Sequence, residues 1–391
     1  MSTAQHVGRA TDRAAHLDRV KVLLVAAIIA VHGVVGYSAW EGAWAYQPVR
    51  EVALATVTEM AIGTLLLPAL LFVMGVFFLV SGLVVPGSLD RRGPRGFARG
   101  RLLRLGVPYA VWVLLVWPAV VWAPRRVAGW DATYWEMFVG AEPFLDAGAM
   151  WFVGVLLLYS LVYAAWRGVQ DRRGGVAGRA DPGGAPVGAR SLAILAGTVS
   201  VATALVRTVL PFDSHQVAEL QVWQWPQYGA LFGLGVVAAR RGGLGPVPGT
   251  TRRAAGRMAA VALAAYAALF ATVVARGLDP TEVFARPVPA PEALALALLE
   301  GPLAVGASVW VLALAQRRLD RPLDGRAVAV ARSAYAAYLV QGVVLLGAAL
   351  ALRPVPVVAE VKALVVATVG VVGSFALGSL LVRRTPVGRV L

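Results

Sequence analysis

The sequence predicts an all-α integral membrane protein that crosses the bilayer about ten times and keeps both termini in the cytoplasm. Apolar residues make up 59% of the 391 residues and charged residues 15%, whereas a soluble chain is roughly 45–50% apolar and about 25% charged. About ten apolar stretches are long enough to span a membrane as a helix, which requires about 20 residues. Basic residues gather at one set of segment ends, as expected when they are retained on the cytoplasmic side.

The expected spans cover most of the chain, and aromatic residues border several of them. Trp40, Trp44 and Tyr46 lie at and after the end of the first span, as in the aromatic belts of membrane–water interfaces. The sixth span is short and opens with Trp223 and Trp225, an interfacial entry. In order, the spans are expected over residues 22–40, 62–83, 102–122, 148–166, 192–210, 222–239, 258–275, 293–315, 333–352 and 363–382.

The charge distribution predicts the orientation of the spans and the organisation of the chain. Assigned to the nearest segment end, most of the 36 lysines and arginines lie on the side of both termini, which places that side in the cytoplasm, at the cell membrane. The longest cytoplasmic connection, residues 168–190, is rich in Gly, Pro and Arg and is expected to be a flexible loop. Residues 1–391 are therefore expected to form one transmembrane domain without a separate soluble domain.

The composition excludes several kinds of site. The chain has no cysteine, which rules out a disulfide framework, a thiolate metal site and a cysteine nucleophile. Its four histidines are too scattered for a zinc cluster, so no metal site is expected. A net charge of +15 in a soluble protein would suggest nucleic acid. In a chain this apolar it indicates topology and contact with membrane lipid, and no nucleic-acid partner is expected.

The first expected span carries the sharpest candidate for catalysis, His32, which is the histidine that lies inside an apolar segment. Lys21 precedes it by eleven residues, or about three helical turns, so the two side chains share a helix face about 16 Å apart along the axis. An ionisable residue at this depth is a functional candidate, and a neutral imidazole is suited to removing a proton. The alternative is a histidine that only hydrogen-bonds a neighbouring helix.

A second candidate site follows the second span. The segment 77–82 reads FFLVSG, and Arg99 and Arg101 flank one residue just before the third span. Guanidinium groups bind phosphates bidentately, so the two arginines are candidates for binding the phosphates of a nucleotide. Taken alone, they are explained better by the ordinary excess of positive charge on the cytoplasmic side.

Together these stretches resemble the membrane-bound acyltransferase 3 family. That family has a similar start in its first span, an Arg-x10-His spacing, an FFxxSG segment and an Arg-x-Arg motif. The similarity continues at Trp151-Phe152-Val153, at residues 230–241 (ALFGLGVVAARR) and at residues 332–341 (RSAYAAYLVQ). The order of the motifs covers nearly the whole chain.

The resemblance implies an acyltransferase that moves an acyl group, by default acetyl, from cytoplasmic acyl-CoA to a hydroxyl group. Acyl-CoA would be a donor substrate and not a bound cofactor. Its phosphates would meet Lys21, Arg99 and Arg101, and His32 would act as base or as acyl relay. The acceptor would be an envelope carbohydrate, a glycolipid or a secreted metabolite.

Two residues depart from the pattern of the family. Lys21 stands where the family has Arg, which keeps the charge and loses the planar fork. Gln341 stands where the late motif usually ends in His, and it is expected to pack or to form a hydrogen bond instead of acting as a base.

Glu59, Trp151 and Trp225 are the candidate contacts of the acceptor. Glu59 and Glu300 lie near the outer ends of spans, where a carboxylate could orient His32 or the acceptor, although a hydrogen bond between helices is an equally good interpretation. The tryptophans could stack on a sugar ring, but anchoring at the membrane interface explains them more simply.

The alternative function is a proton-coupled transporter or flippase of a lipid-linked or sugar substrate. In such a protein His32 would relay protons and the arginines would only set the topology. The expected gathering of Lys21, Arg99 and Arg101 at one cytoplasmic mouth favours acyl transfer. Moreover, the sequence shows no internal repeat with paired broken helices, which is typical of transporters.

Overall fold

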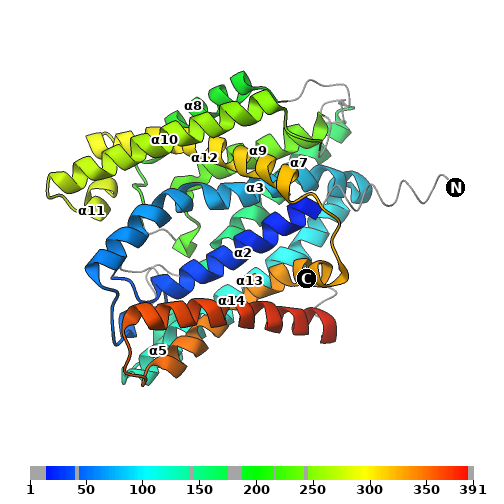
Figure 1. Cartoon of the computed structure of the whole chain (residues 1–391). Coiled ribbons are helices and arrows are strands. Elements are labelled where there is room, and N and C mark those ends of the chain that lie inside the picture. The colour runs from blue at the N-terminus through cyan, green and yellow to red at the C-terminus, as the bar shows by residue number, and fades with distance from the viewer. Residues whose placement is uncertain are drawn as a thin grey trace.

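The chain is described from a computed structural model, which covers residues 15–39, 44–140, 145–174, 187–214, 217–241 and 245–385. These residues form helices and connections without a strand (Figure 1), which confirms the all-α prediction. In chain order the helices are α2 (Ala15–Val35), α3 (Thr56–Arg101), α4 (Val107–Val111), α5 (Trp117–Val127), α6 (Tyr134–Val139), α7 (Trp151–Arg172), α8 (Ala189–Val206), α9 (Trp225–Arg240), α10 (Gly249–Ala275), α11 (Pro280–Phe284), α12 (Pro291–Arg318), α13 (Gly325–Leu352) and α14 (Ala359–Arg384).

Seven helical stretches among the described residues could cross a membrane by their length and composition. One of them runs over Thr56–Val127 and holds 72 residues, far more than the about 20 that one crossing requires. The chain is therefore a multi-pass membrane protein. The helices at the first and sixth expected spans, α2 and α9, are not among the seven, so ten spans and cytoplasmic termini stay predictions.

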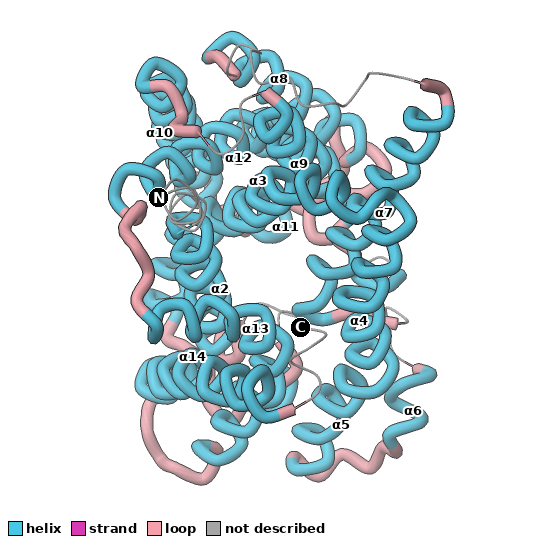
Figure 2. The backbone as a smooth tube through the Cα atoms, turned by 90° about the vertical axis from the view of Figure 1, so that its right-hand side faces the viewer, coloured by secondary structure: helices cyan, strands magenta, loops and turns pink. Residues whose placement is uncertain are grey.

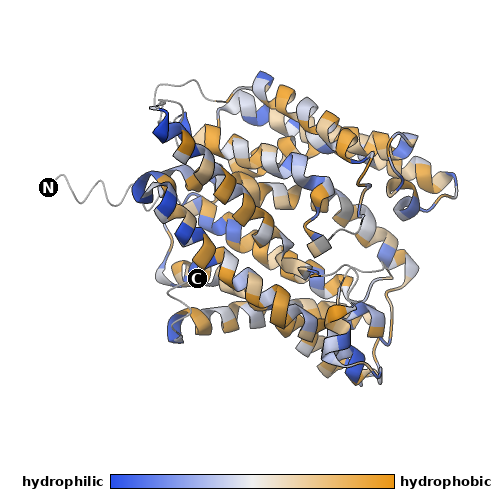
Figure 3. Cartoon of the chain, turned by 180° about the vertical axis from the view of Figure 1, so that it is seen from behind, coloured by the Kyte–Doolittle hydropathy of each residue, from blue (hydrophilic) through white to orange (hydrophobic). Residues whose placement is uncertain are grey.

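The surface of the bundle fits an apolar surrounding. Large apolar side chains face outward along the long helices, for example Leu65 and Val261, which are 74% and 70% exposed. Figure 3 shows apolar colour along the helices and polar colour mostly at their ends and in the connections. Lipid would cover this outward surface, whose exposure to water is unfavourable.

The helices pack as two groups joined by α2 and α3. α12 packs on α8, α10 and α3, while α13 packs on α14 and α2. Figure 2 looks along most of the helices and shows α8 and α10 on one edge of the bundle, α14 on the opposite edge and α2 and α3 between them. The side at which α2 begins and α14 ends carries the arginine-rich helix ends and is called the basic side below.

The helix α2 begins seven residues before the first expected span, at Ala15, and ends at Val35. Its first turns contain charged residues, which are not part of the apolar run that predicted the span. Lys21 Nζ donates to the Asp18 carboxylate at 2.8 Å, and Arg19 donates to the backbone oxygen of Arg321 at 2.7 Å. These groups find partners, so the helix begins before the expected span, whose boundary at residue 22 stays a prediction.

The segment 77–82 lies in α3 at its closest contact with α9. A Cβ atom on Gly82 would lie 2.1 Å from the backbone oxygen of Phe232, and one on Gly235 would lie 2.3 Å from that of Leu79. The two glycines therefore let the helix backbones touch. This gives Gly82 a packing role and leaves Ser81 facing a cavity on the basic side.

The connection expected over 168–190 is shorter in the structure. The helix α7 continues to Arg172, and α8 begins at Ala189. Residues 175–186, which hold most of the expected loop, lie outside the described residues.

Candidate active site

His32 lies in the last turn of α2, inside the bundle, where one polar and one aromatic side chain meet it. Its Nδ1 is 3.0 Å from the side-chain oxygen of Gln341 on α13. Its ring stacks on Trp44, with centroids 4.8 Å apart and an angle of 13° between the planes. The imidazole is therefore held both at its edge and over its face.

The hydrogen bond decides which nitrogen of His32 is available for chemistry. An amide oxygen only accepts, so Nδ1 carries the proton in this arrangement and Nε2 keeps its lone pair. A hydrogen bond to one ring nitrogen sets the role of the other. Nε2 is accordingly the atom that can remove a proton or accept an acyl group.

A wall of tryptophans continues from Trp44. The ring of Trp44 is 5.6 Å from that of Trp117, which in turn stacks on Trp112 at 6.1 Å. Trp117 donates its indole N–H to Asp146 at 2.6 Å, and Trp112 donates to the backbone oxygen of Ala147 at 3.1 Å. These bonds satisfy buried indole groups and so hold the rings in one orientation.

The local backbone explains why Trp112 and Trp117 face the same side. Residues Trp112–Val116 form the π-helical turn η3, in which the N–H of Trp117 donates to the carbonyl of Trp112. In an α-helix residues five apart point about 140° away from each other, whereas the wider turn brings the two rings together. Gly148, with φ of +46°, lies against the ring of Trp117 where a Cβ would be only 2.5 Å away.

Lys21 lies on α2, the helix of His32, at its end on the basic side. It borders a cavity of about 190 Å³ between α2 and α3. Ser81 and Phe77 of the FFLVSG segment form part of the opposite wall. The ammonium group of Lys21 already pairs with Asp18, so an incoming anion would compete with this carboxylate. The structure thus places Lys21 and the FFLVSG segment at one cavity.

The two arginines differ in their surroundings. Arg99 is exposed, whereas Arg101 is partly buried and its guanidinium lies 5.0 Å from the centroid of the Phe97 ring. Arg101 is also close enough to Arg104 to interact with it electrostatically. Neither arginine is among the described residues that line the cavity beside Lys21, and the expected gathering of the three cations at one mouth stays a prediction.

The candidate acceptor residues do not contact His32 in the described part of the chain. Glu59 accepts a hydrogen bond from the backbone N–H of Ala39, in the connection that follows α2. Trp151 stacks on Tyr228 with centroids 5.4 Å apart. Trp225 donates to the backbone oxygen of Leu220 at 2.9 Å. All three therefore have structural partners.

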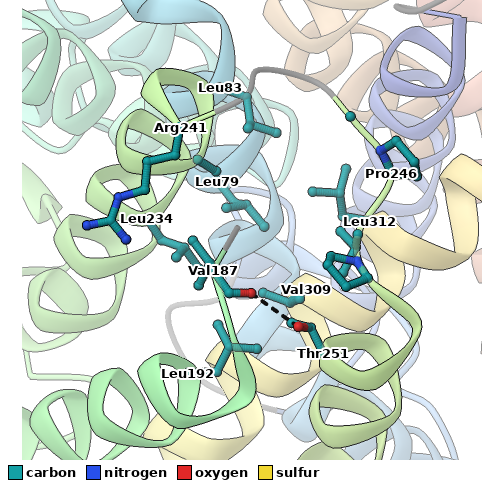
Figure 4. Close-up of a pocket in the computed structure, with 14 residues that line it drawn as sticks. Leu79, Leu83, Val187, Leu192, Leu234, Arg241, Pro246, Thr251, Val309 and Leu312 are labelled. Atoms are coloured by element: carbon teal, nitrogen blue, oxygen red, sulfur yellow. Dashed lines mark hydrogen bonds between the residues drawn. The ribbon is translucent and has the colours of Figure 1, made fainter. Parts of the chain in front are cut away.

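A second cavity, of about 140 Å³, lies on the basic side between α3, α8, α9, α10 and α12 (Figure 4). Its walls are mainly leucine, valine and proline side chains, and the guanidinium of Arg241 points away from it. Thr251 donates its hydroxyl to the backbone oxygen of Val187. This cavity offers little that could orient a reacting group.

The structure contains a buried ion pair, of which the sequence indicated only one member. Arg207, just after α8, pairs with Glu300 of α12, and the two side chains are 1% and 0% exposed. Glu300 stood out as a charge inside a span, but Arg207 lies near a span end and looked like an ordinary interfacial arginine. The signal that could have found it is the need of Glu300 for a partner in an apolar surrounding.

The described residues contain no group of three histidine, aspartate or glutamate side chains that could hold a metal ion. A family model described as an acyltransferase domain matches residues 15–383. The chain belongs to the acyltransferase 3 family. No curated protein and no solved structure matches it.

As a member of the acyltransferase 3 family with several membrane-spanning helices, the chain is a membrane acyltransferase. The structure shows where the two residues that depart from the family pattern lie. Lys21 borders the cavity at the basic side, and Gln341 forms the expected hydrogen bond, with His32 as its partner. Trp44 stacks on His32, and Trp117 packs against Trp44; neither contact was expected.

Proposed function

We propose that the protein transfers an acyl group, acetyl by default, from acyl-CoA to a hydroxyl of an envelope carbohydrate, a glycolipid or a secreted metabolite at the cell membrane. The observation that carries this proposal is the arrangement of His32, whose Nδ1 is engaged by Gln341 and whose ring is stacked on Trp44. Nε2 is then free to act as a base of fixed orientation. The membership of the chain in a family of acyltransferases suggests what that base would be used for.

In the proposed reaction, Nε2 of His32 removes the proton of the acceptor hydroxyl while the oxygen attacks the thioester carbonyl carbon. The carbon–sulfur bond then breaks, and the imidazolium returns the proton to the leaving thiolate of CoA. A second route forms an acyl-histidine first, from which the acceptor takes the acyl group. Either route ends with an ester and free CoA.

The donor is proposed to bind from the basic side. Lys21 borders a cavity there, and the two arginines follow in the same long helix that forms its other wall. The phosphates would be bound by Lys21, Arg99 and Arg101, and the pantetheine arm would extend along α2 toward His32. Lys21 and His32 are about 16 Å apart along the helix axis. The extended pantetheine arm would cover this distance.

The deciding experiment measures release of free CoA from acetyl-CoA by the purified full chain, with and without a panel of sugar acceptors. His32→Ala is expected to lower acceptor-dependent release by at least about 100-fold, because general base catalysis contributes roughly 10²–10⁴-fold. Ser374→Ala, which alters a buried hydroxyl on α14, serves as the matched control. Undiminished turnover in His32→Ala would remove His32 from the mechanism.

The same preparation tests the transporter alternative. Movement of an unmodified sugar or lipid-linked solute across proteoliposomes without release of CoA would replace the proposal. Mass spectrometry of envelope glycans and lipids from cells with and without the gene would identify the acceptor by a missing acyl mass.

Arg101 and Arg99 provide a test of the donor site. Arg101→Ala is expected to raise the KM for acetyl-CoA several-fold more than it lowers kcat, because phosphate binding is the same in the ground state and the transition state. Arg99→Ala is expected to have a smaller effect, since Arg99 is exposed and Arg101 is partly buried. An unchanged KM in both variants would limit the arginines to setting topology.

A further inference from the structure

The ion pair of Arg207 and Glu300 belongs to a larger group of buried polar side chains. Trp223 precedes α9, Gln227 lies in its first turn, and Thr203 lies one turn before Arg207 on α8. These five residues are called the Arg207–Glu300 cluster. Each of them is at most 5% exposed, although the cluster contains a full positive and a full negative charge.

Arg207 contacts two other members of the Arg207–Glu300 cluster directly. The guanidinium of Arg207 lies 5.2 Å from the ring centroid of Trp223, and it also pairs with Glu300. Tyr228, the neighbour of Gln227 in the chain, interacts electrostatically with both charged residues. The cluster is thus one group at the meeting of α8, α9 and α12.

Every member of the cluster has a polar atom without a hydrogen-bond partner among the described residues. These atoms are Nε and Nη1 of Arg207, Oε2 of Glu300, Nε1 of Trp223, both amide atoms of Gln227 and Oγ1 of Thr203. A buried polar atom without a partner costs about 1–3 kcal/mol, and most buried polar atoms in proteins are paired. So many in one place indicate that something else supplies the partners.

The chemistry of these atoms selects the ligand. They include donors on Arg207 and Trp223, an acceptor on Glu300 and both kinds on Gln227. An anion would meet the carboxylate of Glu300, and a cation would meet the guanidinium of Arg207. Hydroxyl groups both donate and accept and carry no charge, so a neutral ligand with several hydroxyl groups fits the cluster.

Aromatic contacts connect the cluster with the surroundings of His32. Tyr228 stacks on Phe78 at 4.6 Å, and Phe78 meets Phe152 at 5.0 Å. Phe152 in turn lies 6.3 Å from Tyr338, which is one turn before Gln341 on α13. The cluster and the catalytic candidate are therefore two ends of one continuous packed region.

The cluster is closed in this structure, and the contacts of α9 with α8 and with α12 are the smallest around it. The helix α8 packs mainly on α12, and α9 packs mainly on α3, while α8 and α9 contact each other only slightly. Arg207 and Glu300 belong to the first pair, and Trp223 and Gln227 to the second. Because α12 also packs on α3, the two pairs stay joined there, and a sugar can enter only where α9 meets α8 and α12.

We propose that the Arg207–Glu300 cluster binds the hydroxyl groups of a neutral sugar, the carbohydrate part of the acyl acceptor. The identification of this sugar as acceptor rests on the proposed function, whereas the binding itself does not. Buried water molecules have the same hydrogen-bonding chemistry, and the experiment separates the two sources.

The test is saturation-transfer NMR on the full chain in nanodiscs, without acyl-CoA. The probes are methyl glycosides of glucose, galactose, mannose and N-acetylglucosamine, with methyl glucuronate as the anionic comparison. At least one neutral glycoside is expected to bind the unaltered protein and Ser374→Ala, and to bind more strongly than the glucuronate. Its affinity is expected to fall at least about fivefold in Gln227→Met and Trp223→Phe, which keep the Arg207–Glu300 pair intact.

Two results would overturn the proposal. If no neutral glycoside binds the unaltered protein, the partners of the cluster are water alone. If binding is the same in Gln227→Met, Trp223→Phe and Ser374→Ala, the sugar binds elsewhere. Failure of the proposed function looks different, because binding would then persist while no glycoside supports release of CoA from acetyl-CoA.

Discussion

The His32 site and the Arg207–Glu300 cluster bury polar groups in the same bundle, but they differ in how those groups are satisfied. His32 has a hydrogen bond at one ring nitrogen and an aromatic face below it. The cluster instead holds two opposite charges against each other and leaves polar atoms of all five residues without partners in the described part of the chain. The first arrangement fixes the orientation of one imidazole, and the second leaves a set of donors and acceptors without partners among the described residues.

This difference teaches that depth in the bundle does not by itself distinguish a reactive site from a binding site. A single neutral imidazole needs one partner to set its orientation, and the rest of its surroundings can be apolar. A buried charge requires a charge of opposite sign, and the remaining atoms of both groups then need further partners. Four variants can test this contrast.

The largest expected effect on stability is that of Glu300→Ala. Removing one partner of a buried ion pair leaves an uncompensated charge and costs about 3–5 kcal/mol, so the unfolding temperature of the detergent-solubilised protein should fall sharply. His32→Ala should lower it less, because one hydrogen bond and one ring contact of a neutral side chain are lost and no charge is left unpaired.

The double variant Arg207→Met/Glu300→Leu sharpens the same contrast, since replacing both charges with apolar side chains often restores stability. Its unfolding temperature should lie well above that of Glu300→Ala. Equal losses in the single and double variants would show that the pair is not the source of the effect.

A smaller effect is expected for Gln341→Leu, and it should appear in kcat instead of stability. The variant removes the acceptor for Nδ1 of His32, and a net hydrogen bond is worth about 0.5–1.5 kcal/mol. Acceptor-dependent CoA release should therefore fall by up to about tenfold, while the KM for acetyl-CoA stays the same. A raised donor KM with unchanged kcat would place Gln341 in donor binding instead.

The smallest expected effect is on stability at acid pH, and it concerns the connection between α2 and α3, which contains Trp44. Glu51 in this connection accepts hydrogen bonds from Lys362 of α14 and from Tyr46. Burial alone would raise the pKa of the Glu51 carboxyl, but the bonds from Lys362 and Tyr46 hold its pKa below the ordinary 4.5. The ionised Glu51 and its two partners therefore stabilise the folded state above about pH 4.5. This stabilisation is lost as the pH falls through the lowered pKa that Glu51 has in the folded state.

In Glu51→Gln this part of the acid sensitivity should disappear. Thermal unfolding measured between about pH 3 and pH 7 should show a smaller drop at the acid end than in the unaltered protein, and a slightly lower unfolding temperature at pH 7. A curve of unchanged shape would exclude Glu51 as a titrating contributor.

Much of the fold could be predicted from the sequence because long apolar runs and helix length are local properties. The helix ends were less predictable, as α2 shows. Its charged first turns remain helical because Lys21 pairs with Asp18 and Arg19 reaches the connection between α12 and α13. The break in α3 at Gly93, which has φ of +69°, and the π-helical turn at Trp112 were not visible in the apolar pattern either.

The candidate site shows the same division. His32 was found because an ionisable residue in an apolar run is costly wherever the helix packs. The stacking of Trp44 on its ring was not predicted, since Trp44 lies after the end of the first expected span, where a tryptophan is typical of the membrane interface. Arg207 was hidden for the same reason, because a charge near a span end needs no special explanation until its partner is known.

The sequence by itself determined that this is a helical membrane protein of acyltransferase pattern with one histidine inside an apolar segment, because hydrophobicity, charge bias and motif order belong to the chain. Only the tertiary structure decided that Gln341 and Trp44 orient that histidine, that Gly82 is a point of helix contact and that Arg207 pairs with Glu300. These relations join residues tens to hundreds of positions apart, and they follow from how the helices pack and not from any local pattern.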